Sequence, residues 1–278
     1  MLKFPKAQIG IFGGSGFYDF LSKGKEIDIK TPYGRPSDKI LVGEYEGKAV
    51  AFLPRHGKKH QFPPHEIPYR ANLYAFKMLG VNTIIAPIAA GSLQSKIKPG
   101  DFVLCDQFVN KTHGRADTYF EGEKTKNAFS SAKVAHISSA NPYCLNLRQF
   151  VLKTAKNLKI KVHPKGTVVV INGPRFSSKS ESEYFQRQNW EVINMTQYPE
   201  CILAKELEMC YLGIALITDY DAGLIGQKGI KPVSMEEVVK VFQGNNDRVK
   251  KLIFEIVRRL PDTRVCGCHT ALKEAVVG

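Results

Sequence analysis

Short apolar runs alternate with amphipathic segments along most of this chain. Continuous apolar runs, which are typical of buried strands, occur at residues 7–12, 83–90, 102–104, 166–171 and 212–218. A further strand is expected at residues 190–196. Residues 39–54 form two shorter runs on either side of Glu46-Gly47-Lys48, and this pattern predicts a hairpin.

Helical spacing of apolar residues occupies several of the intervals between these strands. It predicts helices over residues 69–79, 145–158, 200–211 and 234–260, the last interrupted at residues 244–246. Gly80 is placed to end the first helix, and Ser178 with Glu181 has capping-box spacing, as has Ser234 with Glu237. Residues 110–135 are polar and irregular. This pattern predicts a long loop that closes over a site or meets a neighbouring subunit.

No linker, low-complexity tract or internal repeat divides the 278 residues, so we expect a single domain over residues 1–278. Its 43% hydrophobic content is enough for a sizeable core. No apolar run reaches the ~18 residues of a membrane span, and the first residues lack the order of a signal peptide. We therefore expect a cytoplasmic protein with no membrane partner.

The net charge of +14 raises the question of an anionic partner. Lysine and arginine are scattered along the whole chain rather than gathered in a stripe, and no nucleic-acid-binding motif is evident. The charge therefore favours attraction of a small anion such as phosphate over binding of nucleic acid.

Two segments are suited to hold that anion. The strand at residues 7–12 leads into Gly13-Gly14-Ser15-Gly16, where glycine backbone amides and the Ser15 hydroxyl can donate to a phosphate. This loop matches neither the dinucleotide fingerprint nor the P-loop pattern, so an ordinary tight turn after a buried strand remains the alternative interpretation. At the end of the hairpin, Arg55 and His56 offer a guanidinium fork beside an imidazole, although a surface pair is the alternative.

Two segments further along the chain are suited to hold a planar base. Asp219 and Asp221 follow the strand at residues 212–218, and residues two apart in extended backbone face one side. Neighbouring carboxylates resist ionising together, so one can keep a proton for a ring nitrogen. Phe176 can stack on a planar base. The alternatives are a loop cap for the aspartates and a core position for Phe176.

The six cysteines are expected to be reduced and mostly buried. Cys266-Gly267-Cys268 next to His269 admits a metal site. No C-x-x-C pair accompanies it, so we predict no metal.

Taken together and in this order, the motifs resemble those of the methylthioadenosine phosphorylases of the purine nucleoside phosphorylase superfamily, over about residues 8–260. The segments that carry the resemblance are residues 13–16, 31–38, 55–57, 91–93, 99–101, 173–178, 194–196 and 218–221. The resemblance implies one α/β domain with a mixed, partly barrel-like sheet flanked by helices, and a tail at residues 261–278. It also implies a homotrimer or a hexamer built as a dimer of trimers, with sites near subunit interfaces.

The resemblance also implies a role for individual residues. Phosphate would contact Ser15, Arg55, His56, Ala89 beside Ile88, and Thr196. The ribose would contact Met195, and the purine Phe176, Asp219 and Asp221, with Asp219 as the proton donor. Ser177 and Met235 would tune substrate choice, and Val238 and Val239 would extend the apolar wall of the site. His136 would be offered to the 5′-pocket of the neighbouring subunit, and His60 would lie close to that same pocket.

This sequence departs from the family where Ile88 stands in place of a common hydroxyl residue, which puts one phosphate contact in doubt. Its cysteines also resemble those of disulfide-bearing archaeal members, with Cys144 and Cys210 as one pair and Cys266 and Cys268 as another. The implied activity is phosphorolysis of 5′-methylthioadenosine, with phosphate as co-substrate and no cofactor. The alternatives are a broader purine nucleoside phosphorylase and a non-enzymatic nucleotide- or RNA-binding protein.

Overall fold

The computed structural model describes residues 4–13, 24–122, 133–227, 230 and 234–277. Within these residues eleven strands form one mixed sheet, and two short strands form another. The large sheet contains β1 (Ile9–Gly13), β2 (Lys25–Ile27), β3 (Ile40–Tyr45), β4 (Lys48–Pro54), β5 (Thr83–Ser92), β6 (Phe102–Leu104), β7 (Gln107–Lys111), β9 (Val162–His163), β10 (Thr167–Ile171), β11 (Val192–Asn194) and β12 (Cys210–Tyr220).

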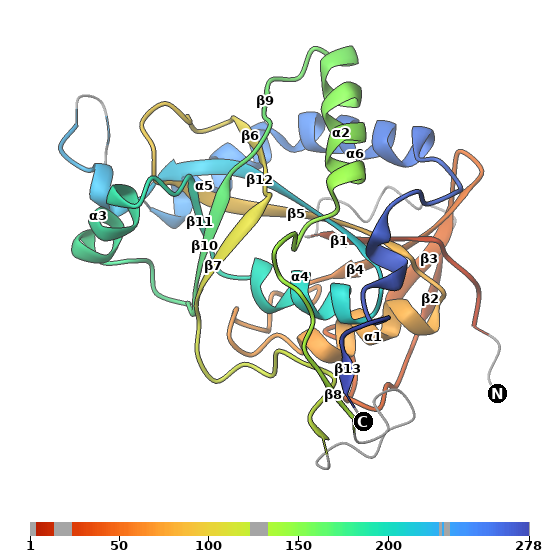
Figure 1. The fold of residues 1–278 in the computed structure, drawn as a ribbon. Helices are drawn as coiled ribbons and strands as arrows, with labels where there is room; N and C mark the ends of the chain where they lie inside the picture. Colours follow the sequence, from red (N-terminus) through yellow and green to blue (C-terminus); the bar gives the residue numbers. More distant parts are fainter. Residues whose placement is uncertain (1–3, 14–23, 123–132, 228–229, 231–233, 278) are drawn as a thin grey trace.

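Strand β5 is the centre of the sheet (Figure 1). Its first residues lie between the parallel strands β1 and β12, and its last residues pair with the antiparallel strand β11. Beyond β1 the order continues through β4, β3 and β2, and beyond β11 through β10 and β7. This branching at β5 gives the mixed sheet that the resemblance implied.

Helices cover both faces of the sheet. On one face α1 (Tyr69–Met78) packs against α4 (Gln197–Glu206), and on the other α2 (Leu145–Asn157) lies beside α6 (Asn246–Arg259) (Figure 1). The remaining helices are α3 (Lys179–Arg187) and α5 (Met235–Gly244). Strand β1 is apolar throughout because both of its faces are buried. Ile9 and Ile11 pack on the α2 and α6 side of the sheet, whereas Phe12 packs on the α1 side.

Several predicted boundaries are confirmed. The hairpin forms as β3 and β4, Gly80 follows α1 with a φ of +85°, and the C-terminal helical region breaks between Gly244 and Asn246. The predicted helix over residues 200–211 was wrong at both ends, because α4 spans Gln197–Glu206. Its predicted last turn is instead the start of β12, where Cys210 pairs with Thr83 of β5, so sheet pairing overrides helical spacing.

Helix α3 begins with the capping box that the sequence predicted. The Ser178 hydroxyl accepts from the Glu181 amide at 3.2 Å, and the Glu181 carboxylate accepts from the Ser178 amide at 2.7 Å. We expect Ser178→Ala to lower the free energy of unfolding by about 1 kcal/mol, because one amide of the first turn loses its acceptor. Urea denaturation measures this. Ser180→Ala in the same turn is the control, and equal losses in both variants would contradict the capping role.

Candidate active site

A cavity of about 230 Å³ opens where the carboxyl ends of several strands meet. Ligands of open α/β sheets bind at such edges, because loops and backbone amides converge there. Strands β4, β5, β10, β11 and β12, or the residues that directly follow them, supply most of the lining.

Most of the predicted site residues line this one cavity: Arg55, His56, His60, Ile88, Ala89, Phe176, Ser177, Met195, Thr196, Asp219 and Asp221. Ser15 lies outside the described residues, as do the side chains of Met235 and Val238. Val239 is 44% exposed and is not among the residues that line the cavity.

His136 is also absent from the lining. It directly follows β8 (Val134–Ala135), which pairs with β13 (Val276–Val277), and its amide donates to the Ala275 carbonyl at 2.8 Å. A role for His136 in a neighbouring subunit's pocket stays a prediction.

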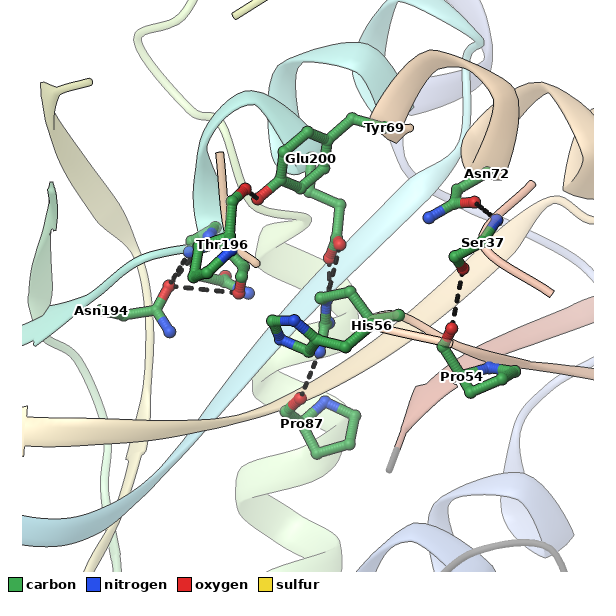
Figure 2. A network of polar contacts seen from close by, with 12 residues as sticks. Ser37, Pro54, His56, Tyr69, Asn72, Pro87, Asn194, Thr196 and Glu200 are labelled. Carbon is green, nitrogen blue, oxygen red and sulfur yellow. Dashed lines mark hydrogen bonds and ion pairs between the residues drawn. The ribbon is translucent and has the colours of Figure 1, made fainter. Parts of the chain in front are cut away.

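The Arg55 guanidinium is fixed by a buried ion pair with Glu200 of α4. Nε and Nη2 donate to the two carboxylate oxygens at 2.6 and 3.0 Å, and Nη1 donates to the Pro87 carbonyl at 3.2 Å. In Figure 2 the Glu200 carboxylate and the Pro87 carbonyl approach from opposite sides, and the dashed lines between them mark these hydrogen bonds. Three of the five N–H groups are therefore used, and the other two have no partner among the described residues, so they can meet a ligand.

This arrangement changes how Arg55 can act. The sequence suggested a guanidinium fork free to meet an oxyanion, but the edge formed by Nε and Nη2 already holds Glu200. A phosphate would have to use the remaining N–H groups. Glu200 was missed as a site residue because it lies within the apolar face of a helix, where a sequence offers no sign of its partner.

His56 and His60 lie together at the same side of the cavity lining. Their rings are stacked, with centroids 4.4 Å apart and planes inclined by 17°. Nδ1 of His56 lies 2.9 Å from the Phe62 carbonyl, which can only accept, so Nδ1 carries the proton and the neutral ring offers Nε2 as an acceptor. Burial lowers the pKa of His56 to about 4, with Arg55 and His60 adding to the effect.

The lowered pKa of His56 predicts a specific pH dependence. The unfolded chain takes up the proton near the ordinary pKa of 6.5, whereas the folded protein resists it down to about 4. The contribution of His56 to stability is therefore complete above pH 6.5 and is lost as the pH falls toward 4. An NMR titration of the His56 ring should give a midpoint near 4 without phosphate and a higher one with it. A midpoint at 6.5 in both would contradict the burial of a neutral ring.

Asn194 organises the turn from β11 into α4, and sequence reasoning missed it. Its Nδ2 donates to the Ala89 carbonyl at 3.1 Å, while its Oδ1 accepts from the amides of Thr196 and Gln197 at 2.6 and 2.9 Å. Thr196 is thereby held at the start of α4 (Figure 2). It is one of the residues that line the cavity. An asparagine at a strand end is the sequence signal that could have identified this turn, because its side-chain oxygen can accept from backbone amides two and three residues on.

Asp219 and Asp221 flank Gly91 of β5. A Cβ built on Gly91 would lie 3.1 Å from the Asp219 carboxylate and 3.6 Å from the Asp221 Cβ, so the glycine makes room for both. The register between β12 and β5 shifts at residues 217–219, and this bulge lets the neighbouring residues Thr218 and Asp219 both line the cavity. Both aspartates line the same cavity.

The two aspartates nevertheless differ in environment. Asp221 is 3% exposed and accepts from the Ser177 hydroxyl at 2.5 Å, whereas Asp219 accepts from the Thr218 hydroxyl at 2.6 Å. Burial raises the pKa of Asp221 above its ordinary value, although the hydroxyl contacts oppose the shift. Ser177 therefore lines the cavity and also donates a hydrogen bond to the Asp221 carboxylate.

The apolar part of the lining includes Phe176, Met195, Ile88 and Ile193. Phe176 is 38% exposed, which is unusual for a large apolar side chain and leaves its ring accessible to a ligand. Polar groups gathered beside an accessible aromatic ring suit a molecule with an anionic end and a planar end.

The chain matches the family model described as the phosphorylase superfamily over residues 8–258, and it belongs to that superfamily. It is 47% identical to the S-methyl-5′-thioadenosine phosphorylase of Pyrococcus furiosus over 270 residues, covering 97% of this chain and 99% of that protein. It is also 45% identical to a purine nucleoside phosphorylase of Streptomyces coelicolor, covering 96% and 95%.

Solved structures agree with this placement. A methylthioadenosine phosphorylase from an antarctic soil metagenomic library superposes with a TM-score of 0.88 at 37% identity, covering 99% of this chain and 93% of that one. The methylthioadenosine phosphorylase of Schistosoma mansoni in complex with adenine gives 0.83 at 37% identity, covering 91% of each chain. Both have the fold described above.

Proposed function

We propose that this protein cleaves 5′-methylthioadenosine with inorganic phosphate and releases adenine and 5-methylthioribose 1-phosphate. The observation that carries the proposal is the convergence, in one cavity, of anion-binding groups with an exposed aromatic ring and two carboxylates. The high identity to proteins named for this reaction supports the choice of substrate.

The anion-binding groups are Arg55, His56 and Thr196. The two N–H groups of Arg55 that have no partner among the described residues donate to phosphate oxygens. The Thr196 hydroxyl does the same in place of its 3.4 Å contact with Asn194 Oδ1. Nε2 of neutral His56 accepts a hydrogen bond from the P–O–H group of a hydrogen phosphate. Arg55 and Thr196 are 5% and 4% exposed, so little reorganisation is needed when phosphate binds.

The base-binding groups are Phe176, Asp219 and Asp221. Phe176 stacks on the purine, Asp219 holds N7, and Asp221 accepts from the 6-amino group. The Ser177 hydroxyl holds Asp221 in place from the opposite carboxylate oxygen. Met195 contacts the ribose between the two ends.

The reaction needs no nucleophilic side chain, because phosphate itself attacks C1′. As the glycosidic bond breaks, its electron pair moves to the purine, and a proton from Asp219 at N7 stabilises the leaving base. The protein positions the anion and stabilises the developing charge by fixed hydrogen bonds. Phosphate is a co-substrate, and this chemistry calls for no organic cofactor.

Release of adenine from methylthioadenosine, measured with and without phosphate, tests the proposal. We expect strict dependence on phosphate and a higher kcat/KM for methylthioadenosine than for adenosine or inosine. Preference for inosine or adenosine would favour the broader nucleoside phosphorylase, and absence of turnover would favour a binding protein. Release without phosphate would indicate a nucleosidase.

We place the reaction in the cytoplasm and in a trimer-based oligomer. The 5′-pocket would then be completed by His60 and the neighbouring subunit's copy of His136. Light scattering after gel filtration should give a mass of three or six chains. In the described part of the chain, no helix is long and apolar enough to span a bilayer.

A further inference from the structure

Four of the six cysteines gather at a second place in the molecule. Cys144 immediately precedes α2, Cys210 is the first residue of β12, and Cys266 and Cys268 flank Gly267 in the C-terminal tail. The four Sγ atoms all lie within 4.8 Å of one another. None of these residues lines the cavity of the candidate active site.

The arrangement matches the needs of a tetrahedral thiolate site. Zinc bound to four sulfurs at ~2.3 Å separates them from one another by about 3.8 Å. Small changes of thiol rotamer bring sulfurs that already lie within 4.8 Å to that separation. Cys266 is the N-cap of the short 3-10 helix η4 (Gly267–Thr270) and Cys268 lies in its first turn, and the sulfurs of both residues reach the cluster despite the short C-x-C spacing.

The same geometry argues against two separate disulfides. The pairs suggested by the resemblance are Cys144 with Cys210 and Cys266 with Cys268. In the structure Cys210 Sγ lies 3.3 Å from Cys266 Sγ, a contact that joins one suggested pair to the other. The four sulfurs therefore form a single group.

The surroundings of the cluster offer access from outside. Cys144 and Cys210 are buried, whereas Cys266 and Cys268 in the tail are only partly buried. Lys205 lies close enough for its charge to interact with Cys268. A cavity of about 250 Å³ is lined by Cys144, Cys210 and Cys266 together with Lys153 and Arg264, and it provides a path for an ion.

We propose that Cys144, Cys210, Cys266 and Cys268 bind one zinc ion, which joins the C-terminal tail to the core. Binding releases the thiol protons and forms four Zn–S bonds, with no change in oxidation state. Two ligands come from the core and two from the tail. The tail also contains β13, whose partner β8 leads to His136, so the ion would fix the segment that carries that histidine.

The test uses the full-length protein made in zinc-supplemented medium and purified with reductant. Elemental mass spectrometry should find about one zinc per chain. After a chelator removes it, added Co²⁺ should restore one equivalent with the intense visible absorption of a tetrahedral thiolate site, and the melting temperature should be lower without metal than with it.

Cys266→Ser and Cys268→Ser lie in the tail and should each reduce bound zinc at least tenfold. Cys105→Ala is the matched control, since Cys105 is buried and outside the cluster, and it should keep one equivalent. The proposal is overturned if the reduced wild-type protein, with all thiols titratable after denaturation, binds less than a tenth of an equivalent of Zn²⁺ or Co²⁺. Isolation with two disulfides and no uptake of metal after their reduction would overturn it equally.

Discussion

Glu200→Gln is expected to destabilise the protein by about 3–5 kcal/mol and to raise the KM for phosphate roughly tenfold. Glu200 is fully buried and accepts two hydrogen bonds from Arg55 and one from the Tyr211 hydroxyl at 2.6 Å. Glutamine removes the negative charge and leaves the Arg55 guanidinium buried without a counterion, which is the costly way to break a buried pair. The guanidinium also loses the contacts that orient its remaining N–H groups toward the cavity.

Denaturation in urea with and without phosphate, together with phosphate kinetics, measures both effects. Phosphate should restore part of the lost stability, because an anion beside Arg55 replaces the missing charge. Glu206→Gln is the matched control: this second buried glutamate of α4 accepts from Thr118 and Tyr119 instead. If both variants shift the phosphate KM equally, Glu200 does not act through Arg55.

Arg55→Ala tests the same contact from the other side. A charge-assisted hydrogen bond is worth about 1.5–3 kcal/mol, so phosphate binding should weaken roughly tenfold or more. The variant leaves Glu200 buried without its partner, so its stability has to be measured first. Unchanged phosphate affinity in a folded Arg55→Ala protein would remove Arg55 from the site.

The sequence was most informative where chemistry and backbone geometry act locally. The strand ends followed by Arg55-His56 and by Asp219-Tyr220-Asp221 each indicated ligand groups, and the structure brings both to one cavity. The capping box at Ser178 and the helix break near Asn245 were equally local and were predicted correctly.

Contacts between distant segments could not be predicted in the same way. Glu200 is an ordinary helix residue until α4 packs against β12 and presents it to Arg55. The C-x-C pair of the tail was visible in the sequence, but its grouping with Cys144 and Cys210 was not, because three separate parts of the chain supply the four cysteines. The C-terminal end of α4 was predicted wrongly for a similar reason, since the pairing of Cys210 with β5 decides where the helix must stop.

The base-reading role of the aspartates leads to the second large effect. The double variant Asp219→Asn with Asp221→Asn should lower the adenosine-to-inosine ratio of kcat/KM at least roughly tenfold. A carboxylate accepts from the 6-amino group of adenine but opposes the lone pairs of a 6-oxo group, whereas an amide can donate to that oxygen. Loss of the proton donor at N7 should also lower kcat for both nucleosides.

Asp101→Asn is the control for a general effect of replacing a carboxylate by an amide. Asp101 precedes β6, where it contacts Lys161 and His163, and it does not line the cavity. It should change stability and leave the nucleoside ratio unaltered. Because Ser177 donates to Asp221 and can accept from an amide in its place, the double variant should keep its fold. A folded double variant with the parent's ratio would mean that the two aspartates shape the wall beside Gly91 and do not read the base.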